Sequence, residues 1–102
     1  MAQLVVTYYT PDDPKEFDRH YFETHVPLAK AIPGLRRFEL TEGPVLTPAG
    51  ASDIYRIAIL HFDSVEAIRT SFASPQGQAT SQDAQKFMTD RDTLLMFEKR
   101  EI

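Results

Sequence analysis

The chain has 102 residues, 42% of them hydrophobic and 25% charged, a composition typical of one soluble globular domain. Its net charge of −4 argues against a general nucleic-acid or membrane-surface binder, because such proteins carry a basic stripe. The absence of cysteine excludes disulfides, thiol nucleophiles and thiolate metal sites.

The sequence has no feature of an exported or membrane-inserted protein. Its first residues lack the basic start and the long apolar run of a signal peptide. No segment reaches the roughly 20 apolar residues that a membrane helix needs. Together with the lack of cysteine, these features predict a cytoplasmic location.

A strand and a long helix are predicted for the first third of the chain. Residues 3–10 are rich in β-branched and aromatic side chains, which favour strands. The turn that follows contains Asp12 and Asp13, either of which can cap a helix, and Pro14 suits the first helical turn.

Pro27 is expected to interrupt this helix. It removes one backbone hydrogen bond, its ring clashes with the carbonyl of Glu23, and it pushes Val26 away from helical angles. We therefore expect a break or kink just after His25, followed by a second helical piece that Gly34 ends.

Two strands separated by a loop are predicted next. Residues 35–45 form the second strand, and Gly43-Pro44 should disturb its pairing, as suits an edge strand. Residues 46–52 are expected to form an exposed loop, and residues 53–62 the third strand.

The last third predicts two helices and a final strand. An Asp-Ser pair can cap a helix over residues 65–73, and residues 74–77 contain the proline and glycine that stop it. A short extra helix is expected over residues 81–89, and the last strand over residues 93–102.

The predicted order is β-α-β-β-α-β, which is the ferredoxin-like arrangement of an α+β domain. In this single domain, helices cover one face of a four-stranded antiparallel sheet, and the first and third strands are central.

Both central strands are apolar on both faces. In the first, one side presents Leu4, Val6 and Tyr8, and the other presents Val5, Thr7 and Tyr9. In the third, Ile54, Ala58, Leu60 and Phe62 oppose Tyr55, Ile57 and Ile59. Helices can cover only one of these faces, and soluble monomers avoid a large exposed apolar patch. We therefore expect a homodimer formed by sheet-to-sheet packing.

One face of the long helix combines apolar and titratable side chains. Phe17, Tyr21, His25 and Leu28 follow the spacing of a single helical face, so Tyr21 and His25 are neighbours. Phe17 and Leu28 are candidate apolar contacts to a substrate. His20 lies five residues before His25, about 140° around an α-helix, so the two histidines should not easily share a ligand.

His25 is the best candidate for chemistry, because an imidazole takes or gives a proton near neutral pH. Tyr21 can hydrogen-bond to it or donate to a developing oxyanion. The competing interpretation is that both are core residues that close the layer between helix and sheet.

Other candidates surround this pair. His20 is either a rim residue or a mouth residue that orients a polar substrate. Arg56 either holds a carboxylate or enolate at the end of the pocket or forms a surface ion pair. One of Tyr8 and Tyr9 should line the pocket and the other the dimer interface, while His61 should face the partner or solvent.

Several site types lack support in the sequence. The three histidines have no i, i+4 spacing, so a zinc or iron site is not expected. There is no dinucleotide fingerprint, no P-loop and no nucleophile elbow, so no bound cofactor is expected either.

The run F-D-x-H-Y-x-x-x-H-x-P-L-x-x-x-x-P-G-L over residues 17–35 resembles the signature of the EthD-like family. Residues 62–78 and 94–97 are also similar to that family. The resemblance implies the fold and dimer of the dimeric α+β barrel superfamily, whose small members use a histidine, often with a tyrosine, in a pocket between helix and sheet.

Two functions follow from these observations and from the resemblance. The first is a small cofactor-independent enzyme in which His25 shuttles a proton on an apolar, aromatic or lactone-like molecule, with Tyr21 assisting. The reaction would be an isomerisation, a cyclisation or an oxygen insertion, of isomerase or oxidoreductase type, and the resemblance associates it with catabolism. The second is a non-catalytic small-molecule-binding or accessory protein of a degradation pathway.

Overall fold

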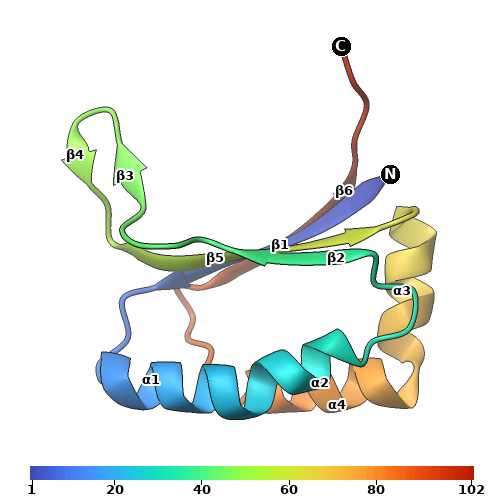
Figure 1. Cartoon of the computed structure of the whole chain (residues 1–102), viewed down its shortest axis with the longest axis horizontal. Helices are drawn as coiled ribbons and strands as arrows, with labels where there is room; N and C mark the ends of the chain where they lie inside the picture. Colours follow the sequence, from blue (N-terminus) through green and yellow to red (C-terminus); the bar gives the residue numbers. More distant parts are fainter.

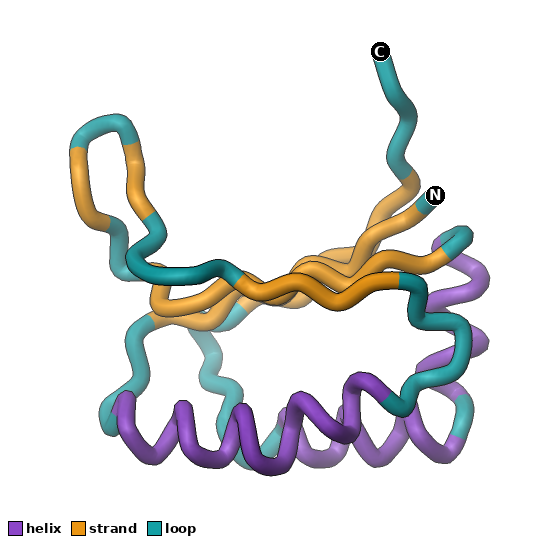
Figure 2. The backbone as a smooth tube through the Cα atoms, in the orientation of Figure 1, coloured by secondary structure: helices purple, strands orange, loops and turns teal.

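A four-stranded antiparallel sheet with helices on one face forms the core of the computed structural model, which describes residues 1–102 (Figures 1 and 2). The strand order is β2-β5-β1-β6. The bounds are β1 Ala2–Tyr9, β2 Arg37–Leu40, β5 Ile54–Phe62 and β6 Thr93–Glu98. The predicted α+β class, the central first and third strands and the edge position of the second strand are confirmed.

The helices lie in a layer beneath the sheet, and one of them closes its end (Figure 1). Helices α1 (Pro14–His20) and α2 (Val26–Lys30) run along the sheet with α4 (Pro75–Ala84) beside them. Helix α3 (Val65–Ala73) rises from this layer toward the sheet, and its bounds are those predicted.

Side chains from the inner sheet face and from the helices form one hydrophobic core. In register, Leu4 pairs with Leu60 and Val6 with Ala58, and all four side chains are buried. The rest of the core comprises Ala2, Tyr8, Phe17, Tyr21, Ala29, Ile32, Phe62 and Ile68.

An irregularity in strand pairing corrects one face assignment. The register shifts between Tyr8 and Tyr9, opposite the start of β5. Tyr55 reaches helix α1, where its hydroxyl donates to Asp18 Oδ2 at 2.8 Å and its ring packs edge-on against Phe17. Tyr55 therefore does not share the outer face with the isoleucines of β5.

Of the break or kink predicted after His25, the break is wrong, because a π-helical turn accommodates Pro27. This turn, η1, spans Tyr21–His25, and the amide of Val26 donates to the carbonyl of Tyr21 in the i→i+5 pattern. Val26 keeps helical angles of φ −57° and ψ −47°. The shifted pattern removes the bond from residue 27 to Glu23 that proline cannot make, so the helix continues.

Residues 46–52 also differ from the prediction of a loop. They contain a short hairpin of β3 (Leu46–Thr47) and β4 (Gly50–Ala51). Figure 1 shows this hairpin and the C-terminal segment projecting from the face of the sheet opposite the helices.

Residues 74–77 end α3 and also start α4. Helix α4 therefore begins at Pro75, whereas the sequence predicted a start at residue 81. Ser74 ends α3 and caps α4, because its Oγ accepts from the amide of Gly77 at 3.1 Å. Pro75 takes the first helical turn, where its missing amide costs no hydrogen bond. A Cβ on Gly77 would lie 2.3 Å from the backbone oxygen of Ser71, so only glycine permits this close approach of α3 and α4.

Replacing Gly77 with alanine should lower the free energy of unfolding by about 1–3 kcal/mol, because overpacking against rigid backbone outweighs the better helix propensity of alanine. Urea unfolding followed by circular dichroism measures this loss. Gln82→Ala, at an exposed position of the same helix, is the matched control. Equal stability of the two variants would contradict the close-approach argument.

Candidate active site

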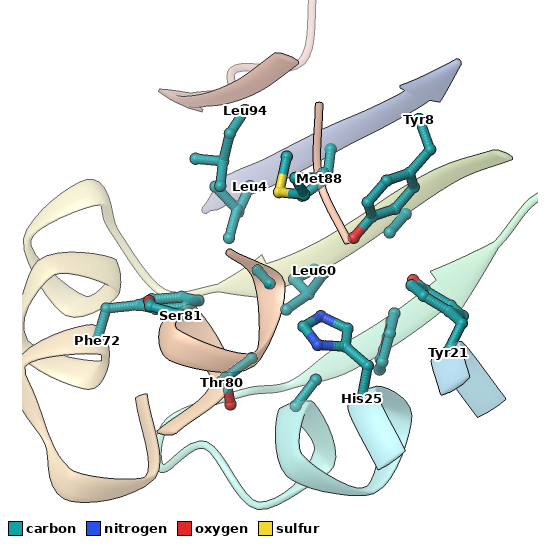
Figure 3. A pocket seen from close by; sticks show the side chains of 15 residues that line it. Leu4, Tyr8, Tyr21, His25, Leu60, Phe72, Thr80, Ser81, Met88 and Leu94 are labelled. Carbon is teal, nitrogen blue, oxygen red and sulfur yellow. The ribbon is translucent and has the colours of Figure 1, made fainter. Parts of the chain in front are cut away.

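A small apolar cavity lies between the helices and the inner face of the sheet (Figure 3). Its volume is about 50 Å³. Most of its wall is aliphatic or aromatic, and the polar side chains on it are Tyr8, Tyr21, His25, Thr80 and Ser81. The cavity therefore offers a few hydrogen-bonding groups in an otherwise apolar space.

His25 is held in this wall by a buried carboxylate. Its Nδ1 lies 3.0 Å from Oδ2 of Asp83, which projects from α4. The two residues are 6% and 3% exposed, so the contact is shielded from solvent. An ionised carboxylate only accepts hydrogen bonds, so Nδ1 carries the proton and Nε2 presents its lone pair.

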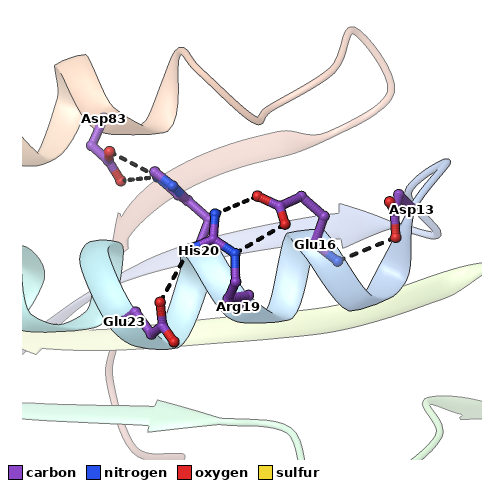
Figure 4. Close-up of polar contacts among 6 residues, drawn as sticks. All are labelled: Asp13, Glu16, Arg19, His20, Glu23 and Asp83. Carbon is purple, nitrogen blue, oxygen red and sulfur yellow. Dashed lines mark hydrogen bonds and ion pairs between the residues drawn. The ribbon is translucent and has the colours of Figure 1, made fainter.

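Asp83 binds His20 as well, with His20 Nε2 2.9 Å from Oδ1 and 3.0 Å from Oδ2 (Figure 4). The expectation that the two histidines cannot share a partner is therefore wrong. Residues five apart diverge on an α-helix, but the π turn between them widens the helix and brings both onto the side of α4. Figure 4 also shows the exposed Arg19 of α1 paired with Glu16 and Glu23.

The environment of His25 favours its neutral form. Burial lowers the pKa of the His25 imidazole, and the neighbouring Asp83 carboxylate opposes that shift in part. A neutral ring with a free Nε2 is the form that accepts a proton.

Two tyrosine hydroxyls lie at the same end of the cavity as His25 (Figure 3). The rings of Tyr8 and Tyr21 meet edge to face with centroids 5.4 Å apart, and the His25 ring lies 5.4 Å from that of Tyr21. Burial raises the pKa of Tyr21 to about 12. Burial and the neighbouring Tyr21 also raise the pKa of Tyr8, so both phenols stay protonated as hydrogen-bond donors.

Of the other sequence candidates, only Tyr8 joins Tyr21 and His25 on the cavity wall. Phe17 stacks on Tyr21 with centroids 5.7 Å apart and does not line the cavity. His20 faces a different surface cleft of about 250 Å³, and Leu28 is half-buried outside the cavity wall.

Arg56 does not reach the cavity either. Its guanidinium carbon lies 4.9 Å from the centroid of the Tyr21 ring, and its Nη2 donates to Asp18 at 3.0 Å. Its Nη1 is buried without a partner. Arg56 therefore supports the tyrosine from behind instead of closing the end of the pocket.

Sequence reasoning missed Asp83, Thr80 and Ser81. A signal for Asp83 was present, because it lies four residues before Phe87, whose ring packs 4.8 Å from that of His25. An acidic side chain on the inner face of a helix needs a partner, and His25 is the partner here.

The structure also bears on metal binding and on membrane insertion. No three histidine, aspartate or glutamate side chains are arranged to hold a metal ion. The helices are all too short or too polar to cross a lipid bilayer.

The chain matches the EthD domain over residues 11–91. Over 102 residues it is 32% identical to an uncharacterized 11.0 kDa protein in the thcB-thcC intergenic region of Rhodococcus erythropolis, covering all of this chain and 98% of that protein. It is 35% identical to an ethyl tert-butyl ether d (ethd) family protein from Bacillus halodurans, whose crystal structure gives a TM-score of 0.89 over 98% of this chain and 99% of that chain.

More distant structures share the fold. Hydroxynitrile lyase from Passiflora edulis gives a TM-score of 0.74 at 18% identity, over 99% of this chain and 94% of that chain. SnoaB, a cofactor-independent oxygenase from Streptomyces nogalater, gives 0.66 at 19% identity over the same shares. A dimeric ferredoxin-like protein of unknown function from Thermobifida fusca gives 0.64 at 14% identity, over 94% of this chain and 87% of that chain.

At such low identities these three likenesses show the fold alone. The EthD domain match, in contrast, spans most of the chain, and both relatives above 30% identity align over nearly their whole length. The chain belongs to the EthD domain family.

Proposed function

We propose that this protein is a small cofactor-independent enzyme that acts on an apolar small molecule by proton transfer through His25. The observation that carries the proposal is the contact of 3.0 Å between His25 Nδ1 and the buried Asp83 at the wall of an apolar cavity. A buried carboxylate that orients an imidazole stabilises the imidazolium formed when Nε2 takes a proton.

The tyrosines supply the second half of the mechanism. When His25 removes a proton from a substrate carbon or hydroxyl, negative charge develops on a nearby oxygen of the substrate. The protonated phenols of Tyr8 and Tyr21 are donors beside His25, and hydrogen bonds in a dry site stabilise such an oxyanion strongly.

This chemistry fits an isomerisation, a cyclisation or the deprotonation that precedes oxygen insertion into an electron-rich ring. The likeness to a cofactor-independent oxygenase and to a hydroxynitrile lyase concerns the fold alone, so the choice of an enzyme over a carrier rests on the contact of His25 with Asp83. An aromatic or lactone-like substrate matches the apolar wall.

The size of the cavity limits what it holds. An apolar protein cavity that binds benzene measures roughly 150 Å³, so a cavity of about 50 Å³ accepts only the reacting group of a substrate. The rest of the substrate must lie outside, or the wall must move.

We also propose that the protein forms a homodimer through the outer face of its sheet. That face presents the apolar side chains Val5, Ile57, Ile59, Leu95 and Phe97. Leu95 and Phe97 are exposed large hydrophobics, and the β3–β4 hairpin projects beside this face (Figure 1). The dimeric ferredoxin-like protein from Thermobifida fusca shows that this fold can assemble in pairs.

Replacing His25 with glutamine should lower turnover about 10²- to 10⁴-fold, the range of a lost general base. Turnover is measured by mass spectrometry of products from a panel of apolar aromatic, phenolic and lactone substrates. Glu23→Gln, an exposed substitution in the same helical turn, is the control. Saturable binding of a panel member with no turnover by wild type would favour the accessory function instead.

The pH dependence tests the state of His25. Because burial places the pKa of His25 below the ordinary value near 6.5, the midpoint of the loss of activity at low pH should lie below pH 6.5. Asp83→Asn removes the charge that opposes this shift, so it should lower the pKa of His25 further. Nitrogen NMR of labelled histidine measures both values, and a pKa for His25 above 6.5 in wild type would contradict the description of a buried, neutral base.

Leu95→Glu should dissociate the dimer, because it places a charge among the apolar side chains of the proposed interface. Light scattering after gel filtration should give the mass of two chains for wild type and of one chain for the variant. Lys30→Glu, exposed on the helix layer, should remain dimeric. A monomeric wild type would refute the interface.

A further inference from the structure

A second apolar space adjoins the cavity and opens to the surface. It is a groove of about 430 Å³ beneath the edge strand β6, beside α3. Four of its lining residues also line the cavity of His25, namely Leu4, Phe72, Ser81 and Leu94. The groove and the cavity are therefore neighbours that share part of their walls.

Strand β6 leaves apolar side chains of the inner sheet face exposed in this groove. Leu94 pairs with Val6 and Met96 with Leu4, so both point toward the helix side of the sheet. They are nevertheless 50% and 42% exposed, whereas Val6 and Leu4 are buried. The helix layer does not cover this part of the sheet, although it belongs to the same face as the core.

The groove carries one charged side chain, Arg69 of α3. Its side chain is largely exposed, and its contact is Glu66 Oε2 at 3.8 Å, longer than a direct hydrogen bond. Ser81 adds a hydroxyl where the groove meets the cavity. The cavity thus offers the base His25 and the phenols of Tyr8 and Tyr21. The groove offers an apolar wall and the cation of Arg69.

We propose that the substrate is an elongated apolar molecule with an anionic group, such as a carboxylate, remote from its reacting group. The reacting group enters the cavity at His25, the apolar body lies against Leu94, Met96 and Phe72, and the anion pairs with Arg69. This inference rests on the proposed function for the reacting end. It goes further in assigning the groove as a substrate subsite, whose size lies in the range of small-molecule pockets.

Binding of simple probes tests the subsite without any turnover. Isothermal titration calorimetry of the full chain would use octanoate, octan-1-ol and octylamine, which share one apolar chain and differ in end group. Octanoate should bind most tightly and octylamine most weakly. Arg69→Gln should weaken octanoate binding about two- to fivefold and leave octan-1-ol unchanged, as expected for an exposed ion pair.

Neighbouring residues of β6 provide a matched pair of variants. Leu94→Asn should weaken the binding of octanoate and of octan-1-ol alike, by tenfold or more, because it removes apolar contact with the eight-carbon chain that both probes share. Leu95→Met changes the next residue, which faces the other side of the sheet, and keeps that face apolar, so it should leave the affinity of both probes unchanged. Equal affinities in the two variants would overturn the subsite.

The orientation of the ligand has its own test. If His25→Gln rather than Arg69→Gln removed the preference for octanoate over octan-1-ol, the anion would lie in the cavity and the proposal would fail. Loss of turnover in His25→Gln with unchanged octanoate binding would support the proposed function and the subsite separately.

Discussion

The buried carboxylate of Asp83 is the interaction on which the candidate site depends. A carboxylate at 3% exposure is strongly unfavourable unless donors surround it, and His20 and His25 supply those donors at 2.9–3.0 Å. The same contacts join α4 to the segment formed by α1 and η1. They therefore fix the part of the cavity wall that the helices form. Packing and chemistry therefore rest on one group, and loss of its charge should disturb both.

The π-helical turn explains how two histidines five residues apart reach that carboxylate. Pro27 cannot donate to Glu23, and the i→i+5 bond from Val26 to Tyr21 accommodates this without ending the helix. The turn that accommodates Pro27 also changes the directions in which the neighbouring side chains point. The turn aims His25 into the cavity, whereas His20 lines a separate surface cleft.

The fold was predictable because its signals are local and repeated. The run of β-branched and aromatic residues in β1 and the capped helix over residues 65–73 each indicate one element without knowledge of the others. The site was predictable only in part. Tyr21 and His25 share a helical face under either helix type, but Asp83 lies 58 residues away from His25, and no local pattern connects them. The π turn was missed because a proline in a helix has several outcomes, and only the tertiary partners select one.

Strand β6 shows why the two faces of the sheet cannot be assigned separately. Leu94 and Met96 line the groove on the inner face, while Leu95 and Phe97 lie on the proposed dimer face. Because side chains alternate strictly along a strand, a slip of one residue in the pairing of β6 with β1 would exchange these sets. Such a slip would destroy the groove and the outer face together. The register between Val6 and Leu94 thus connects the proposed substrate subsite with the proposed dimer face, although no residue belongs to both.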